Sequence, residues 1–283
     1  MIWLLAALIF WAGATWAAVR LANGPAAATK AGRLAVAALF GAVILVLWEG
    51  IVRGLAVSPV ILPPPSAIAL RFAGALPTLW GDFVQTILKG ALSGWAIGCT
   101  AAVLTAIAID RSDFLKRGLL PVGNFMAALP IVGIAPILVM WFGFDWQSKA
   151  AVVVVMVFFP VLVNMVAGLA ATDRMQRDLM ATYSASYAQA LWTLRLPAAL
   201  PFLFNGLKIA STLALIGAIV AEFFGSPTRG MGFRISTEVG RLGLDMVWAE
   251  IWVAALAGSG FYGLLALVER RLTFWHPAQR ARG

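Results

Sequence analysis

Residues 202–224 read FLFNGLKIASTLALIGAIVAEFF, an apolar run in which Lys208 and Glu222 are the only charged side chains. A helix of about 20 apolar residues is long enough to cross the hydrocarbon core of a bilayer. Six further runs of this kind cover 2–19, 34–52, 88–109, 120–144, 150–171 and 248–268. The run 120–144 contains Pro121, Pro130 and Pro136, so a kinked or broken helix is expected there. The sequence therefore predicts an all-α polytopic membrane protein.

The composition supports the same fold class. Hydrophobic residues make up 62% of the 283 residues and charged residues 12%, whereas a typical soluble domain is about 45–50% apolar and about 25% charged. An ordinary soluble enzyme is excluded, because so few charges cannot cover so much apolar surface. Cys99 and His276 are the only residues of their types, which argues against a His/Cys zinc site within one chain. We expect Cys99 to be a small buried hydrophobe and His276 to be a surface residue.

The distribution of basic residues predicts how the runs cross the membrane. Thirteen Lys and Arg residues lie in the loops 20–33, 110–119 and 172–201 and in the tail from 269, and six lie in the alternate loops 53–87, 145–149 and 225–247. Cytoplasmic loops are enriched in Lys and Arg, so the first set is predicted to be cytoplasmic, with the N-terminus outside and the C-terminus inside. The net charge of +9 is therefore a topology signal and not a nucleic-acid signal. The run 2–19 has no preceding Lys or Arg and no clear cleavage site, so we expect a retained helix.

Three of the runs carry small residues at four-residue spacing, which lets membrane helices approach closely. These stripes are Gly90, Gly94 and Gly98; Gly206, Ala210, Ala214 and Ala218; and Ala255, Ser259 and Gly263. For each stripe, packing within the subunit is favoured over a seam between two copies.

The predicted cytoplasmic segment 172–201 has a helical pattern. Asp173 can cap a helix, with Gln176 as its capping-box partner. Apolar and aromatic residues then recur every four positions, on one helix face, at Met175, Leu179, Tyr183, Tyr187 and Leu191. Pro197 is expected to end the segment. The pattern predicts a short amphipathic helix pair, which either packs on its own protein or the lipid interface or docks a cytoplasmic partner.

This segment resembles the coupling-helix motif in the membrane subunits of ATP-binding-cassette (ABC) importers. That motif reads Glu-Ala-Ala, three residues, Gly and, further on, Leu-Pro. Asp178 stands at the Glu position, Leu179 and Met180 at the Ala-Ala positions, Ser184 at the Gly position and Pro197 at the Pro position. Because Gly permits a sharp bend, Ser184 must allow the bend without a positive φ or at a modest cost.

Other stretches resemble the permeases of nitrate, sulfonate and taurine importers in the same order along the chain. They are 62–68, 134–143, 158–164, 206–210, 221–222 and 230–233. The resemblance implies a six-helix type I ABC importer permease core plus one extra N-terminal transmembrane helix. Residues 1–33 are then the extra helix and a cytoplasmic loop, and 34–283 form the permease domain, with coupling helices at about 173–196.

The resemblance also implies partners. It implies ABC ATPase subunits, which carry ATP and Mg²⁺, a periplasmic or lipid-anchored substrate-binding protein and a second permease copy, most simply in a homodimer in the bacterial inner membrane. The chain contains no phosphate-loop sequence, so it is expected to hold no cofactor and not to be an enzyme itself. The residues expected to contact the ATPase are Asp178, Leu179, Met180, Tyr183, Ser184, Ala185, Tyr187 and Pro197.

Candidate residues of the translocation path or its gate are Glu222, Phe223, Pro130, Pro136 and Phe158. Charged groups within membrane runs are costly and often functional. Glu222 alternatively holds the external loop 225–247, and the prolines alternatively only kink a helix to improve packing. Glu49, Glu222 and Glu250 lie near predicted external helix ends, where snorkelling towards water would explain them.

Substrate is indicated only by analogy. The stretches 183–186, 230–240 and 274–277 resemble permeases for pyrimidine or thiamine-precursor uptake, which favours a small organic solute. Nitrate, sulfonate and taurine remain alternatives within the same family. Two other classes stay open: an ion-coupled secondary transporter, which predicts charges central in several helices and often an inverted repeat, and a non-transporting subunit of a membrane complex.

Overall fold

A computed structural model describes residues 2–25, 29–112, 114–115, 117–119, 121–122, 130–225 and 228–275. The regular elements in these ranges are helices. Six of the described helices, some built from several segments, are long and apolar enough to cross a membrane. The chain is therefore an all-α polytopic membrane protein with an extra N-terminal helix, as the sequence predicts.

The six spans follow six of the seven apolar runs. Their bounds are α1 (Ile2–Asn23), α2 (Lys30–Gly54), Leu76–Arg111, α8 (Trp146–Ala170), Tyr187–Phe224 and α13 (Leu244–Leu272). The third consists of α4 (Leu76–Phe83), a π-helical segment η2 (Val84–Leu92) and α5 (Ser93–Arg111). The fifth consists of α10 (Tyr187–Ala190), η3 (Leu191–Arg195) and α11 (Leu196–Phe224). Both therefore begin well before the apolar runs that predict them.

Pro197 does not end a helix, contrary to the sequence prediction. It lies in the first turn of α11, and the preceding π-helical turn η3 leads into α11 without a break. A proline has no N–H to donate and displaces the carbonyl four residues before it. The wider π turn accommodates this locally, so the helix continues into the membrane run.

The run 120–144 does not form one spanning helix. Its described part contains α7 (Ile131–Phe142), with Pro130 at the N-cap and Pro136 inside the helix. A helix of this length rises about 18 Å, whereas the hydrocarbon core is about 30 Å thick. The predicted break in this run is confirmed, and the residues 123–129 before it lie outside the described part.

The chain divides into two compact units, and the first contains residues 1–79 and 235–251. Within it α1 packs on α2, because Gly50 and Gly54 let Ala7 and Leu4 approach the α2 backbone closely. Glu49 does not snorkel: its carboxylate accepts the N–H of Ser66 at 2.9 Å and the Ser66 hydroxyl at 2.7 Å. Ser66 lies at the N-terminus of α3 (Pro65–Gly74), where the helix dipole favours a carboxylate.

Glu250, in the first unit, is also not a snorkelling residue. It lies in α13 and is fully buried. In the same unit the rings of Trp48 and Trp248 meet edge to face, with centroids 4.8 Å apart.

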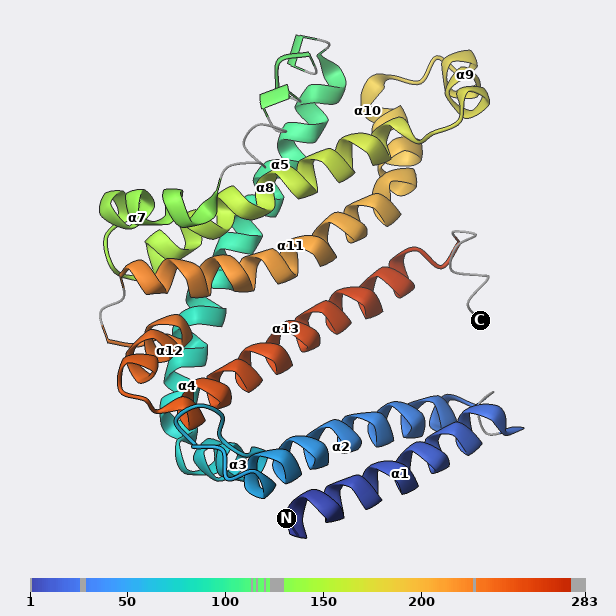
Figure 1. Cartoon of the computed structure of the whole chain (residues 1–283). Coiled ribbons are helices and arrows are strands. Elements are labelled where there is room, and N and C mark those ends of the chain that lie inside the picture. Colours follow the sequence, from blue (N-terminus) through green and yellow to red (C-terminus); the bar gives the residue numbers. More distant parts are fainter. Residues whose placement is uncertain are drawn as a thin grey trace. The chain divides into compact units, whose positions relative to one another are not determined.

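The second unit contains residues 80–234 and 252–283. Its core lies between α5, α8 and α11, and α8 and α11 run alongside each other (Figure 1). A Cβ at Gly94 would lie 2.6 Å from the Ala150 carbonyl oxygen, and one at Gly206 would lie 3.1 Å from Asn164 Cβ. The first two small-residue stripes therefore pack against α8 within the subunit, as favoured above. In the third stripe, Ala255 and Ser259 are exposed.

Candidate functional site

The segment predicted to couple to a partner contains two short helical elements, α9 (Arg174–Thr182) and α10. Each begins with a capping box. Gln176 Oε1 accepts the N–H of Asp173 at 3.2 Å, and Gln189 Oε1 accepts the N–H of Ser186 at 2.8 Å. Such reciprocal caps satisfy backbone donors that the first turn leaves free. The first predicted helix and its Asp173 cap are confirmed, whereas α10 is not a separate short helix but the beginning of the fifth span, Tyr187–Phe224.

The turn between the two helices is a Schellman motif centred on Ser184. The Ser184 N–H donates to the Ala181 carbonyl at 2.9 Å, and the Ala185 N–H donates to the Met180 carbonyl at 3.0 Å, the pair of bonds that defines this cap. Ser184 has φ of +51°, a left-handed conformation in which a side chain costs about 1–2 kcal/mol. Ser184 therefore replaces the Gly of the motif by adopting a positive φ at a cost, and not by avoiding the positive φ.

Because of this turn, the five-residue stripe does not form one continuous helix face, contrary to the sequence prediction. Met175, Leu179 and Tyr183 are 77%, 55% and 77% exposed, and no residue of α9 is buried. Tyr187 packs against the core between the membrane helices, and Leu191 is part of that core. The first three side chains are therefore an exposed apolar surface, and the last two anchor the segment.

The residues expected to contact an ATPase differ in exposure. Asp178, Leu179, Tyr183 and Ser184 are exposed, whereas Met180, Ala185, Tyr187 and Pro197 are half-buried. The Asp178 carboxylate lies 3.9 Å from Arg174 Nε, and both side chains are more than 70% exposed. Exposed pairs of this kind contribute little, so the Asp178 carboxylate is available to a partner.

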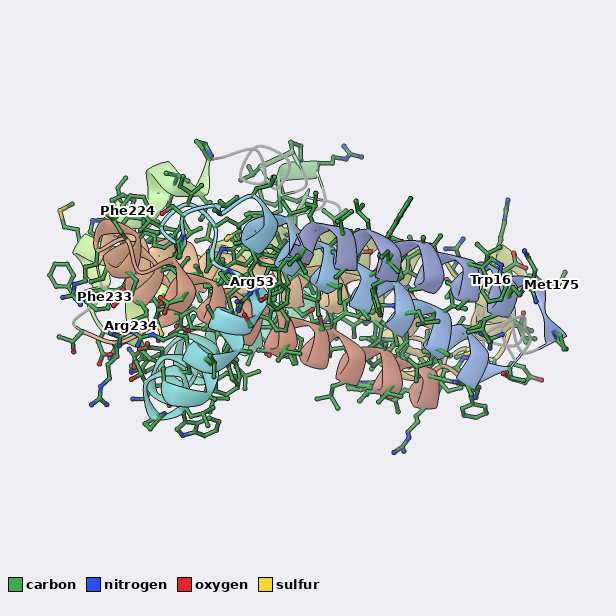
Figure 2. The ribbon with its side chains drawn as sticks, turned by 60° about the horizontal axis from the view of Figure 1, so that its bottom comes forward. Trp16, Arg53, Met175, Phe224, Phe233 and Arg234 are labelled. Atoms are coloured by element: carbon green, nitrogen blue, oxygen red, sulfur yellow. The ribbon has the colours of Figure 1, made fainter. Side chains whose placement is uncertain are left out.

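A buried polar cluster lies at the other end of the second unit. Figure 2 shows Met175 of α9 far from Phe224, Phe233 and Arg234. Glu222, near the end of α11, is 2% exposed. Its carboxylate accepts the Thr86 hydroxyl at 2.8 Å and the N–H of Gly232 at 2.7 Å. Glu222 therefore points into the protein and holds the turn 230–232. This fits its predicted role of holding the loop 225–247 and contradicts snorkelling.

Asp82 and Thr86 complete this cluster, and the sequence prediction missed both. Asp82 is 1% exposed and accepts the N–H of Gly230 at 2.7 Å and Arg234 Nε at 2.8 Å. The Thr86 hydroxyl accepts the N–H of Met231 at 2.8 Å. Their spacing puts Asp82 and Thr86 on one helix face, but they precede the apolar run 88–109, so composition alone does not place them in a membrane span.

Lys149 provides positive charge beside the cluster. The sequence predicts a loop residue here, but Lys149 lies in the first turn of α8 and is 1% exposed. Its ammonium donates to the Phe144 carbonyl at 2.5 Å and to the carbonyl of Gly225, the residue that ends α11. A cation is favourable at a helix C-terminus, and Lys149 also attracts the Glu222 carboxylate.

Asp145 begins α8 just outside the membrane span. Its carboxylate accepts the Gln85 side-chain amide at 3.1 Å and the N–H of Trp146 at 2.8 Å. The Gln85 hydrogen bond, followed by the Trp146 bond, lowers the pKa of the Asp145 carboxyl. Asp145 is therefore an anionic helix cap at neutral pH.

The remaining path candidates lie on three different helices. Pro130 and Pro136 are exposed on α7, and Phe223 is 46% exposed at the end of α11. Phe158 is half-buried in α8, edge to face with Phe159 at 4.9 Å between centroids. Their role in transport stays a prediction.

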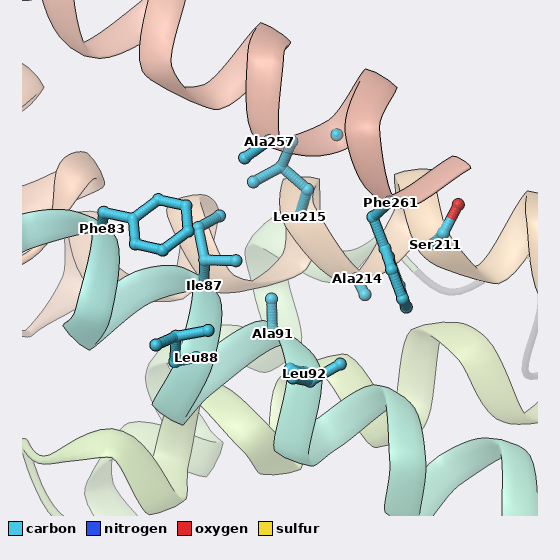
Figure 3. A pocket seen from close by; sticks show the side chains of 11 residues that line it. Phe83, Ile87, Leu88, Ala91, Leu92, Ser211, Ala214, Leu215, Ala257 and Phe261 are labelled. Atoms are coloured by element: carbon cyan, nitrogen blue, oxygen red, sulfur yellow. The ribbon is translucent and has the colours of Figure 1, made fainter. Parts of the chain in front are cut away.

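An apolar cavity of about 190 Å³ lies between η2, α11 and the second half of α13 (Figure 3). Phe83 and Phe261 stand at its sides, and Ala91, Ala214 and Ala257 leave its space open. Ser211 is the single polar side chain of the lining, and its hydroxyl already donates to the Lys208 carbonyl at 2.7 Å. A polar solute would lose hydrogen bonds to water here without replacement, so the cavity does not suit one.

The described residues thus define an integral membrane protein with the short helix α9 exposed at one end. The sequence profile described as "Binding-protein-dependent transport system inner membrane component" matches residues 94–274. The formylaminopyrimidine transport permease protein ThiX of Halalkalibacterium halodurans is 31% identical over 244 residues, which are 85% of this chain and 96% of ThiX.

Two further relatives have the same identity. The riboflavin transport system permease protein RibX of Chloroflexus aurantiacus is 31% identical over 83% of this chain and 88% of RibX. The taurine transport system permease protein TauC of Escherichia coli is 31% identical over 83% of this chain and 87% of TauC. The chain belongs to this family, the permease subunits of ABC importers.

Proposed function

We propose that this chain forms the path of an ATP-driven importer across the bacterial inner membrane and that it binds a separate ATPase subunit through α9. Family membership supports the first part. The main support for ATPase binding through α9 is that this helix has no buried residue and exposes Met175, Leu179 and Tyr183. Exposed apolar side chains outside the membrane spans are typical of a docking surface. Because the chain lacks a phosphate-loop sequence, the ATP and Mg²⁺ would be held by the partner.

The orientation follows from the same proposal. Asp110 contacts Tyr187 and Arg195 at the α9 end, whereas Phe144 lies beside Gly225 at the Glu222 end, so the chain crosses once more between 110 and 144, in addition to the six spans. With seven crossings and α9 on the cytoplasmic side, the N-terminus lies outside and the C-terminus inside, in agreement with the distribution of Lys and Arg. The burial of Lys149 strengthens this asymmetry, since it removes one basic residue from the loops assigned to the outside. The substrate-binding protein would then dock on the face that carries the Glu222 cluster.

The transport step would be a rigid-body rearrangement of two permease copies. Closure of the ATPase pair would draw the two α9–α10 segments together, and the membrane helices would swing from inward-open to outward-open. The ion-coupled alternative is less well supported. The Glu222 cluster lies at one end of its helices, and Lys208 pairs with Glu269 at 2.7 Å, so these groups do not form a chain of proton sites through the membrane.

The substrate in this proposal is a small organic solute, such as a pyrimidine or thiamine precursor. The relative ThiX, named for formylaminopyrimidine transport, matches over nearly its whole length. RibX and TauC are equally identical to this chain, so riboflavin-like compounds, taurine and sulfonates are the alternatives to test. The apolar cavity of Figure 3 offers no polar recognition, which agrees with selection of the ligand by the external binding protein.

The test is co-expression with a candidate ABC ATPase and binding protein from the same organism. Tyr183→Ala combined with Asp178→Ala should abolish co-purification of the ATPase and uptake of labelled formylaminopyrimidine, because both side chains are exposed and free to meet a partner. Arg270→Ala removes an exposed residue at the end of α13 and should leave both measurements unchanged. A double variant with normal ATPase binding and uptake would contradict the docking role. Uptake of taurine instead of the pyrimidine would show that the proposed substrate is wrong and would not affect the docking role.

A further inference from the structure

Three polar side chains meet where the α9–α10 segment joins the membrane helices. Asp110 comes from the last turn of α5, Tyr187 begins α10 and Arg195 ends η3. Arg195 Nη2 donates to Asp110 Oδ1 at 2.5 Å, and the Tyr187 hydroxyl donates to Asp110 Oδ2 at 2.9 Å. Each carboxylate oxygen therefore receives one donor from the segment.

Arg195 also binds a third helix. Its Nε and Nη2 both donate to the Leu169 carbonyl at 3.2 Å, and Leu169 lies in the last turn of α8. Carbonyls in the last turn have no partner within their helix. One guanidinium thus connects the ends of α5 and α8, and its side chain is only 19% exposed.

The position of Asp110 is informative because a carboxylate is unfavourable at a helix C-terminus. Asp110 therefore does not stabilise α5 by its place in that helix. It is held there by Arg195 and Tyr187, and its side chain is 12% exposed. Charge-assisted hydrogen bonds to an arginine fix geometry more strictly than neutral bonds do.

α9 itself has no buried residue, so a force applied to it must reach the membrane helices through the residues at its ends. On its C-terminal side the chain passes the Ser184 turn and is first anchored by a side chain at Tyr187. On its N-terminal side α9 joins α8 through residues 171–173, of which Thr172 is buried. The Asp110–Tyr187–Arg195 cluster is thus the point on the C-terminal side at which displacement of α9 would pass to α5 and to the end of α8.

We propose that Asp110, Tyr187 and Arg195 are positioning residues that make the α9–α10 segment and the ends of α5 and α8 move as one body. This inference rests on the proposed function, in which an ATPase displaces α9. The alternative is that the cluster only stabilises the fold. The two roles differ in when the loss of the cluster changes the structure. A cluster that transmits motion matters only when the ATPase displaces α9, whereas a cluster that stabilises the fold matters in both states.

The test measures a distance within one chain, in the full importer complex reconstituted in lipid. Leu104→Cys on α5 and Arg177→Cys on α9 provide label sites, since both residues are exposed, and Cys99→Ala removes the single native cysteine. Labelled permease is diluted with unlabelled permease. The distance between spin labels is measured without nucleotide and after trapping with ATP, Mg²⁺ and vanadate.

With the native cluster, the 104–177 distance should be the same in both states. In Arg195→Met the distance without nucleotide should match the native one. After trapping, the mean distance should shift or the width of the distance distribution should increase at least twofold, while the ATPase still co-purifies. Arg195→Lys keeps the charge and should show a smaller change. Arg271→Met, an exposed arginine at the end of α13, should behave as the native chain does.

Three results would overturn the proposal. They are an Arg195→Met distance that is native in both states, one that is altered equally in both, and a native chain whose own distance changes on trapping. Failure of the ATPase to co-purify with the native permease is a separate outcome, which would reject the proposed function and this inference with it.

Discussion

Glu222 Oε2 accepts the backbone N–H of Gly232 at 2.7 Å, across ten positions of the chain. The loop between them must fold back on the end of α11 for this bond to form. Gly230 and Gly232 permit the approach: Gly230 has φ of +132°, and a Cβ at Gly232 would meet the Ile219 carbonyl. Together with Asp82 and Thr86, which accept the N–H groups of Gly230 and Met231, the Glu222 carboxylate holds the start of α12 (Met231–Gly240) against the end of α11.

Glu222→Gln should destabilise the protein although it keeps the shape of the side chain. In glutamine one of the two oxygens that accept the Thr86 hydroxyl and the Gly232 N–H becomes an amide NH₂, which cannot accept. A hydrogen bond to a charged group contributes about 1.5–3 kcal/mol, and buried Lys149 also loses a negative charge that attracts it. We expect a clear fall in the melting temperature of the purified permease in detergent. Asp245→Asn is the matched control, because Asp245 pairs with Arg71 at 3.7 Å and both side chains are at least 40% exposed. An equal effect of the two substitutions would contradict a buried charge cluster.

Lys149→Met should also destabilise, and the double variant with Glu222→Gln should be less destabilised than the sum of the two. Groups within one network are not additive, with coupling of about 0.5–3 kcal/mol. The measurement is a double-mutant cycle on thermal unfolding. Additive effects would show that Lys149 acts only through the carbonyls of Phe144 and Gly225.

Gly98→Ala should weaken the packing of α5 on α8. The added Cβ would lie 2.5 Å from Val157 Cγ2 and 3.1 Å from Val154 Cα, and the second atom belongs to a backbone that cannot rotate away. Overpacking of this kind costs about 1–3 kcal/mol. Gly260→Ala on α13 is the control, since no heavy atom lies within 4 Å of that position. Unfolding temperature measures both, and a loss in the control alone would reject the packing argument.

The membrane spans could be predicted because each depends on local composition. The run 202–224 is apolar over its whole length, and no other part of the chain is needed to recognise it as α11. The extension of the same helix back to Tyr187 was not predicted, since Pro197 reads as a stop and only the π-helical turn before it removes that conflict.

The polar clusters could not be predicted for the opposite reason. Thr86 and Glu222 are 136 positions apart, and Asp110 and Arg195 are 85 positions apart. A carboxylate in an apolar run indicates that a partner exists, but which partner it has depends on how the helices pack. Lys149 and Arg195 therefore read as loop charges in the sequence, although both make tertiary contacts with other helices.

Ser184→Gly should stabilise the turn between α9 and α10. At φ of +51° the serine side chain costs about 1–2 kcal/mol, and glycine removes that cost. Glycine also gives the unfolded chain more conformational freedom, which lowers the stability of the folded state by up to about 1 kcal/mol. Ser184→Val should have the opposite sign, because a β-branched residue is a true outlier at positive φ. Protease cleavage between 183 and 186 in the purified permease measures the local effect, with faster cleavage expected for Val and slower for Gly. Both substitutions leave the two Schellman hydrogen bonds available, because these bonds join only backbone atoms. A loss of α9–α10 structure in the glycine variant would therefore show that the serine hydroxyl, and not the backbone conformation, holds the turn.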